Sequence, residues 1–265
     1  MNLRHGSLFN GIGGFQLAAS WMGWENVFSC EIDDFCNKVT KYHFPNCIQH
    51  GDIKTTDFTI YRGRIDVLTG GFPCQPFSVA GEQRGTQDDR FIWHEMLRCA
   101  IEIKPTIIVC ENVTGLIKLA LDKVLSDLEN EGYTCETFII PACGVGAWHK
   151  RDRLWVVAYA DSIRRENEQK ENRKPISNKK RHNSTTQQSR RQQQCGISEP
   201  SFIYQDYYGG ESNKGDWWKV EPAVGRVVDG LPGRVDRLKA LGNAIVPQIA
   251  YEIFKAIESA LCHTP

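Results

Sequence analysis

Short apolar runs alternate with amphipathic segments along the first 160 residues of this 265-residue chain. Continuous apolar runs are typical of strands buried on both faces, and apolar residues three or four positions apart are typical of helices that cover such strands. The alternation predicts an α/β fold with a doubly wound, mostly parallel sheet. Strands are predicted at 3–9, 26–31, 47–50, 65–69, 106–110, 133–140 and 154–160, and helices at 14–22, 33–42, 89–103 and 116–131.

The C-terminal part of the chain returns to a helical pattern. Residues 243–261 place an apolar side chain at every fourth position, which predicts a helix with one buried face. We therefore expect residues 1–160 and 222–265 to form one domain, with residues 161–221 as a small insert. The apolar stripe consists of Ile245, Ile249, Ile253, Ile257 and Leu261.

Charge sets the insert apart from the rest of the chain. The formal net charge is zero, but residues 161–194 hold ten Lys or Arg against four Asp or Glu. Between 164 and 194 the only aliphatic or aromatic side chain is Ile176. Such a segment buries too little apolar surface to offset the entropy of ordering it, which predicts a mobile, partly disordered region that attracts phosphates. A solvated loop without a role is the alternative.

The remaining composition indicates an intracellular protein. Residues 1–5 lack the apolar run of a secretion signal, and no apolar stretch approaches the about 20 residues that a membrane helix needs. The ten cysteines include no Cys-x-x-Cys pair, so neither a zinc site nor a disulfide framework is predicted. We expect a cytoplasmic protein without a metal or a membrane contact, in which most thiols are buried.

One cysteine stands in a different setting. Residues 70–78 read Gly-Gly-Phe-Pro-Cys-Gln-Pro-Phe-Ser and directly follow the predicted strand 65–69. Glycines at a strand end let the backbone turn sharply and let a substrate approach closely. A thiolate is the strongest nucleophile among ordinary side chains once its surroundings lower its pKa. Cys74 is therefore a candidate nucleophile, with a small buried core residue as the alternative reading.

Three predicted strand ends carry residue types suited to an adenosine-like ligand. Residues 9–15 read Phe-Asn-Gly-Ile-Gly-Gly-Phe between the first predicted strand and helix, where glycines let the backbone pass close to a cofactor. Glu31 ends the second strand, where a carboxylate can hold a ribose diol, and Asp52 follows the third strand. Because these ends meet at one edge of a parallel sheet, we expect them to line one crevice.

Two further strand ends carry charge. The strand predicted at 106–110 runs directly into Glu111, which could act on a ring nitrogen of a substrate or could cap the helix that follows. Arg151 and Arg153 are predicted on the same face of a strand, from which they could reach a phosphate or a base carbonyl. An ion-pair cluster with Asp152 at the surface is the alternative.

Taken together and in order, these segments resemble the motifs of the DNA (cytosine-5)-methyltransferases, in the short form of phages and prophages. The resemblance rests on the glycine loop 11–14, Pro73-Cys74-Gln75, Glu111-Asn112-Val113, Arg151-x-Arg153 and Leu241-Gly242-Asn243-Ala244. It implies a Rossmann-like fold, S-adenosylmethionine as the methyl donor, and duplex DNA from which a cytosine is flipped out.

The resemblance also implies a role for each matching residue. Cys74 would attack C6 of cytosine, Glu111 would bind N3 and the exocyclic amine, Arg153 would hold O2, and Arg151 and Gln75 would support the loop. Phe9 would stack on the cofactor adenine, Glu31 would bind the ribose, Asp52 the adenine amine and Asn243 the methionine end. The implied cofactor contacts are Phe9, Gly11, Gly13, Gly14, Glu31, Ile32, Asp52, Ile53, Pro73, Asn243 and Ala244.

Contacts with DNA are expected from two regions. Ser78 and Arg151 would contact DNA beside the flipped base. In the aromatic-rich stretch 202–218, Gln205 and Lys214 are candidates to reach base edges in a groove. The alternatives to a DNA enzyme are a tRNA cytosine-5 methyltransferase and a non-catalytic binder of cofactor or DNA. We expect a monomer, and a partner restriction enzyme cannot be deduced from the sequence.

Overall fold

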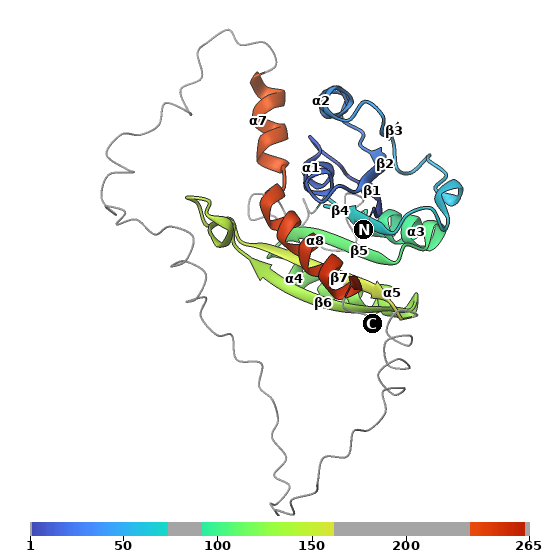
Figure 1. Cartoon of the computed structure of the whole chain (residues 1–265). Coiled ribbons are helices and arrows are strands. Elements are labelled where there is room, and N and C mark those ends of the chain that lie inside the picture. Colours follow the sequence, from blue (N-terminus) through green and yellow to red (C-terminus); the bar gives the residue numbers. More distant parts are fainter. Residues whose placement is uncertain (1, 74–91, 162–233, 263–265) are drawn as a thin grey trace, which may run out of the picture.

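In a computed structural model, the described residues build one sheet with helices on both faces (Figure 1). The structure describes residues 2–73, 92–161 and 234–262. The predicted mobile segment 164–194 and nearly all of the insert 161–221 lie outside these residues, so the division into two regions stays a prediction.

The elements follow the predicted alternation closely. The order is β1 (Arg4–Leu8), α1 (Gly14–Trp21), β2 (Glu25–Cys30), α2 (Asp34–His43), β3 (Ile48–His50), η1 (Thr59–Tyr61), β4 (Val67–Gly70), α3 (Trp93–Ile103), β5 (Ile107–Val113), α4 (Leu116–Leu119), α5 (Leu121–Asn130), β6 (Tyr133–Ile140), η4 (Ala142–Val145), β7 (Arg153–Ala160), α7 (Arg234–Asn243) and α8 (Pro247–Cys262).

The sheet has seven strands in the order β3-β2-β1-β4-β5-β7-β6. Strands β1 to β5 are parallel, and β7 runs antiparallel to both β5 and β6. The mostly parallel, doubly wound fold predicted from the sequence is therefore confirmed. The chain order reverses between β1 and β4, and ligands of such sheets bind at this reversal, beyond the carboxyl ends of the strands.

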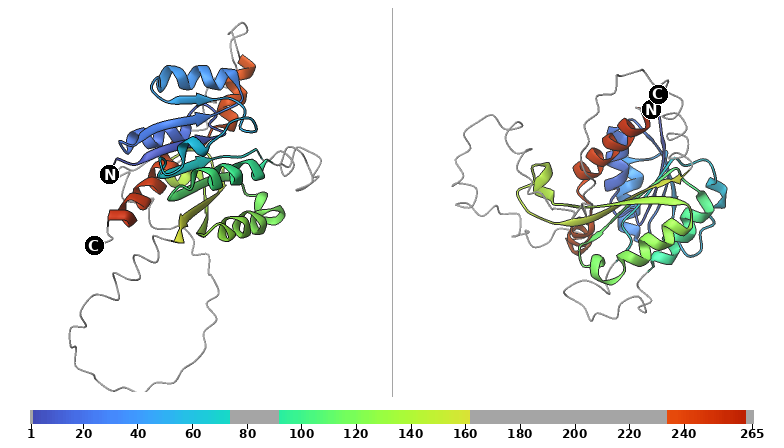
Figure 2. Two further views of the ribbon diagram at one scale, coloured as in Figure 1. Left: turned by 90° about the vertical axis from the view of Figure 1, so that its right-hand side faces the viewer. Right: turned by 90° about the horizontal axis from the view of Figure 1, so that it is seen from below.

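Two apolar layers hold the helices on the sheet. On one face, Phe15 of α1 and Phe254 of α8 pack with Trp155 of β7. On the other face, Trp93 of α3 and Leu128 of α5 join the core. Figure 2 shows α1 and α8 on one side of the sheet and α3 and α5 on the opposite side. Burial on both faces explains why the strands read as continuous apolar runs.

Several boundaries differ from the predicted ones, for example β4 at Val67–Gly70 instead of 65–69, and three differences have a clear structural cause. The helix predicted at 116–131 is two helices, because Ala120 between α4 and α5 has a non-helical φ of −153°. The helix predicted at 243–261 begins only at Pro247, a residue that favours the first turn of a helix, and the separate helix α7 precedes it. Strand β5 extends through Val113, because antiparallel pairing with β7 continues to that residue.

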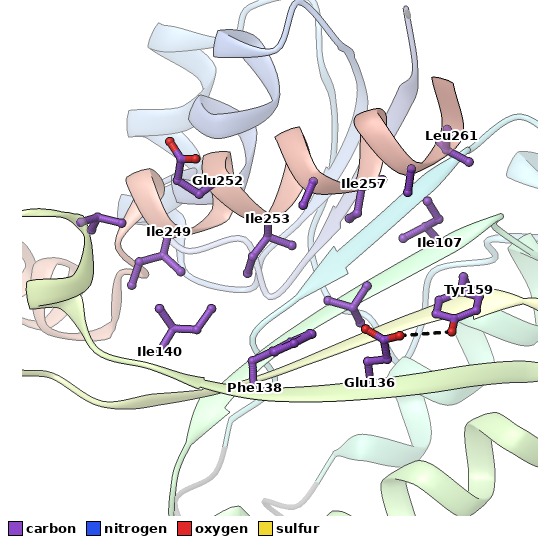
Figure 3. A pocket seen from close by; sticks show the side chains of 14 residues that line it. Ile107, Glu136, Phe138, Ile140, Tyr159, Ile249, Glu252, Ile253, Ile257 and Leu261 are labelled. Atoms are coloured by element: carbon purple, nitrogen blue, oxygen red, sulfur yellow. Dashed lines mark hydrogen bonds between the residues drawn. The ribbon is translucent and has the colours of Figure 1, made fainter. Parts of the chain in front are cut away.

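The apolar stripe of α8 is only partly covered. Ile249 and Ile257 are buried. Between α8 and strands β6 and β7 lies a cavity of about 550 Å³, lined mainly by apolar side chains (Figure 3). Phe138 of β6, which lines it, is 43% exposed. The predicted buried face is therefore confirmed at Ile249 and Ile257, whereas Ile253 between them is half-buried and lines the cavity.

Two searches of the described residues give negative results. Among 2–73, 92–161 and 234–262, no helix is long and apolar enough to span a bilayer. Within the same ranges, no group of three or more His, Cys, Asp or Glu side chains is arranged to hold a metal ion.

The buried His5 side chain in β1 makes stability depend on pH. Its Nδ1 donates to Asn26 Oδ1 at 2.7 Å and its Nε2 accepts from Thr69 Oγ1 at 2.9 Å, an arrangement that fits the neutral ring. Burial lowers the pKa of His5 from 6.5 to about 4. Because the unfolded chain takes up the proton first, stability is complete above pH 6.5 and falls by about 2–3 kcal/mol towards pH 4.5. Chemical denaturation at both pH values checks this.

A matched variant isolates the contribution of this ring. His5→Gln keeps a polar side chain without a group that titrates in this range, so its free energy of unfolding is expected to vary less between pH 7 and pH 4.5. An equal pH dependence in both proteins would assign the effect to other groups.

Candidate active site

The carboxyl ends of the parallel strands bring most predicted site residues to one edge of the sheet. The segment 9–13 follows β1, Glu31 follows β2, and Asp52 lies just beyond β3. Beyond β4 come residues 71–73, and Glu111 lies near the end of β5. The reversal of strand order lies between β1 and β4, so these positions surround the expected binding crevice.

The loop after β1 has a backbone that favours glycine. Gly11 and Gly13 have φ angles of 52° and 87°, in the left-handed region. A Cβ atom at Gly11 would meet nothing within 4 Å, so this part of the loop borders open space. Phe9 also has a positive φ, 50°, although it carries a side chain. Such strain is concentrated at functional sites, and here it accompanies the predicted cofactor loop.

Glu31 joins two loops at this edge. Its Oε2 accepts a hydrogen bond from the Gly11 amide at 2.7 Å, and its Oε1 accepts one from the Asp33 amide at 2.9 Å. Each carboxylate oxygen has a second lone pair that can accept from a ligand hydroxyl. The neighbouring Ile32 side chain is 72% exposed and offers an apolar surface. These features suit a ribose and an adenine ring.

The other predicted cofactor residues differ in what they offer. Asp52 is half-buried, and its Oδ1 accepts from the Lys54 amide at 2.9 Å. Ile53 is buried in the core, so only its main chain is left for a ligand. Phe9 is half-buried against the same core, and Pro73 is exposed beyond β4.

A part-buried ion pair forms at the ends of β5 and β7. Arg153 Nε lies 3.0 Å from Glu111 Oε1, and the side chains are only 21% and 12% exposed. Burial raises the pKa of the Glu111 carboxyl, while Arg153 and Arg151 oppose that rise. Because Glu111 belongs to a strand, its alternative reading as a helix cap is wrong. A carboxyl group in this setting can share a proton with a bound ligand.

The segment leaving β4 passes beside this pair. A Cβ atom on Gly71 would lie 3.4 Å from Glu111 Oε2. Asn112 Nδ2 donates to the Phe72 carbonyl at 3.1 Å, which fastens the segment to β5. Cys74 follows Pro73 in the sequence and lies outside the described residues. No role of its own was predicted for Asn112 from the sequence, although a polar asparagine at the end of an apolar strand indicates a side chain that bonds to a neighbouring segment.

The sequence had predicted Arg151 and Arg153 on the same face of a strand, and this prediction is wrong. Arg151 precedes β7 and has a left-handed φ of 38°, so the alternation of the strand begins only at Arg153. The alternative, an ion-pair cluster of the two arginines with Asp152, is not observed either, because the Asp152 carboxylate pairs with Lys150 at 3.0 Å. Arg151 Nη2 instead donates to the carbonyls of Gly242 at 3.0 Å and Ala244 at 2.8 Å.

The C-terminal motif lies against the cofactor loop. Asn243 is the exposed last residue of α7, and Ala244 is half-buried in the connection to α8. Ile245 lies so close to Gly14 that a Cβ atom there would be 2.6 Å from Ile245 Cγ1. The first and last predicted motifs, far apart in sequence, are thus neighbours. The predicted residues that fall outside the described ranges are Cys74, Gln75, Ser78, Gln205 and Lys214.

Most cysteines of the described part have a pKa raised by burial and are therefore poor nucleophiles. Burial raises the pKa of Cys36 and Cys135 to about 11, and that of Cys30 to about 12. Cys99 and Cys110 are also buried, and burial raises their pKa values further. These thiols are core residues, as the sequence predicted for most of the ten cysteines.

The fold is similar to that of a methyltransferase of known structure, which indicates a methyltransferase-type domain. A solved structure described as a DNA modification methyltransferase encoded within a prophage (E. coli) matches 61% of this chain and 48% of its own, with 25% identity and a TM-score of 0.52.

The family follows from the sequence comparison. A model of the C-5 cytosine-specific DNA methylase family matches residues 3–214, and the chain belongs to this family. The Type II methyltransferase M.Eco47II of Escherichia coli is 37% identical over 163 residues, which are 59% of this chain and 39% of that protein. M.HhaI of Haemophilus parahaemolyticus is 30% identical over 172 residues, 63% of this chain and 52% of that protein. The matches thus span about two fifths to one half of these relatives.

Proposed function

We propose that this protein methylates C5 of a cytosine flipped out of duplex DNA, through a covalent bond between Cys74 and C6. The observation that carries the proposal is the part-buried pair of Glu111 and Arg153 beside the segment that leaves β4. Membership of the C-5 cytosine-specific DNA methylase family supports the same reaction.

The cofactor edge fits S-adenosylmethionine, which supplies an electrophilic methyl group. Open space borders Gly11, the Glu31 carboxylate has lone pairs for ribose hydroxyls, and exposed Ile32 offers a face to the adenine. We assign Asp52 to the adenine amine and Asn243 to the methionine end. Phe9, Gly13, Gly14, Ile53, Pro73 and Ala244 complete the proposed contacts.

Three side chains are proposed to act on the cytosine base, each with a different role. The Cys74 thiolate adds to C6, which moves electron density to C5 and N3 of the ring. Glu111, whose pKa is raised by burial, hydrogen-bonds or protonates N3 and so stabilises the developing negative charge. Arg153 holds Glu111 in place and binds O2 of the base. After C5 accepts the methyl group and loses its proton, the bond between sulfur and C6 breaks and releases Cys74.

A transfer assay tests this function. The full chain is incubated with S-adenosylmethionine tritiated in the methyl group and with either unmethylated duplex DNA or tRNA. We expect tritium in DNA, recovered as 5-methylcytosine after digestion. Label in tRNA alone would change the substrate, and label in neither, with cofactor binding intact, would favour a non-catalytic binder.

The basic segment is proposed to bind phosphates without reading bases. Deleting 166–194 is expected to weaken DNA binding and flatten its dependence on salt, because fewer counterions are released. The methylated sequence, read by bisulfite sequencing, should stay the same, since we assign base contacts to Gln205 and Lys214 and a phosphate contact to Ser78. A changed recognition sequence after the deletion would contradict this division.

A further inference from the structure

Arg151 occupies an unusual position between two parts of the site. It lies two residues before β7, and its φ of 38° turns the backbone there. Its Nη2 donates to two carbonyls, Gly242 O at 3.0 Å and Ala244 O at 2.8 Å. A left-handed conformation is unfavourable for a residue that carries a side chain, and such strain is concentrated at functional sites.

The carbonyls that Arg151 binds belong to the end of a helix. Gly242 and Asn243 are the last residues of α7, where main-chain carbonyls lack partners within the helix. An arginine is well suited to this position because it donates to these carbonyls and complements the negative end of the helix dipole. Arg151 therefore fixes how α7 ends and how the chain turns into α8.

The segment held in this way rests on the cofactor loop. Ile245 follows Ala244 directly and lies against Gly14, the first residue of α1. Lys239, earlier on α7, pairs with Asp33 at 3.1 Å. The Asp33 amide in turn donates to Glu31, the proposed ribose ligand. The C-terminal segment is thus attached to the cofactor edge at two places.

Arg151 is also a near neighbour of the pair that is proposed to bind the base, because it lies two residues before Arg153, whose Nε is 3.0 Å from Glu111 Oε1. Burial lowers the pKa of Arg151, the charge of Arg153 lowers it further, and the charge of Glu111 opposes this. The Arg151 guanidinium is part-buried where it bonds to Ala244. A movement of Glu111 or Arg153 on base binding would therefore be felt by Arg151, and through it by residues 242–245.

We propose that Arg151 is a positioning residue that couples the base pocket to the cofactor pocket by holding residues 242–245 against the cofactor loop. This inference rests on the proposed function and goes beyond it. Coupling of this kind is reciprocal: if bound DNA raises the affinity for the cofactor, the cofactor raises the affinity for DNA by the same factor.

The experiment compares three single variants of the full chain. Calorimetry measures the Kd of S-adenosylhomocysteine, which cannot react, with and without a short duplex carrying the sequence that the protein methylates. In Arg151→Met we expect the Kd without DNA to rise by roughly tenfold and the effect of DNA on it to disappear. Arg151→Lys keeps a hydrogen-bond donor, so part of the cofactor affinity and part of the effect of DNA on it are expected to be recovered. Lys150→Met, which removes a neighbouring exposed charge, should match the wild type.

A double-mutant cycle separates positioning from direct contact. Ile245→Ala removes the contact with Gly14 and leaves the carbonyls that Arg151 binds. If Arg151 acts through this segment, Arg151→Met should add little to the Kd of Ile245→Ala. Additive effects, or an unchanged Kd and unchanged effect of DNA in Arg151→Met and Arg151→Lys, would overturn the inference. A wild-type chain that binds no cofactor would instead overturn the proposed function, and this inference with it.

Discussion

Cys74→Ser is expected to lower the rate of cytosine methylation by roughly 10³-fold or more, since a serine alkoxide is far less accessible than a thiolate at neutral pH. Burial raises the pKa of six of the eight described cysteines, for example that of Cys135 to about 11, which makes these thiols poor substitutes for Cys74. Affinity for S-adenosylmethionine should stay within about twofold of wild type, because we assign the cofactor to the ends of β1 to β3. Tritium transfer and calorimetry measure the two quantities.

Two controls accompany this variant. Cys262→Ser changes an exposed cysteine near the end of α8 and should leave the rate unchanged. In the presence of S-adenosylmethionine, duplex DNA carrying 5-fluorocytosine should form a stable complex with the wild type, because fluorine replaces the C5 proton and cannot be eliminated in its place, and none with Cys74→Ser. A serine variant that keeps more than about a hundredth of the rate would remove Cys74 from the role of nucleophile.

Glu111→Gln is expected to lower turnover by roughly 10²-fold or more, because the amide retains the shape of the side chain but cannot share a proton with N3. The change occurs where burial raises the pKa of the carboxyl, so the protonated form is more accessible than in a free glutamate. Single-turnover kinetics with saturating DNA measure the effect on the chemical step.

The matched control is Glu136→Gln on β6, whose carboxylate lies at the cavity under α8 and away from Arg153. It should keep the wild-type rate. Binding of S-adenosylmethionine should change little in either variant. If calorimetry showed that Glu111→Gln loses cofactor affinity while single turnover at saturating cofactor stayed normal, Glu111 would belong to the cofactor site and not to the base site.

Much of the site could be predicted because parallel strands bring their carboxyl ends to one edge. Gly11, Glu31 and Asp52 each follow a short apolar run, and the structure places all three at that edge. The pairing of Glu111 with Arg153 could not be predicted from the sequence, because it depends on the antiparallel register of β5 against β7. A strand one residue out of register would turn either side chain to the opposite face of the sheet.

The succession of strands and helices along the chain, the resemblance to the family and the candidate nucleophile could all be predicted from the sequence, because apolar periodicity and short motifs are local properties. Which residues contact each other depends on the tertiary structure. It replaced the expected pair of arginines on one strand face by two different roles, with Arg153 on Glu111 and Arg151 on the C-terminal segment. Contacts between residues so far apart in the chain depend on the packing of α7, α8 and β7, which no local pattern specifies.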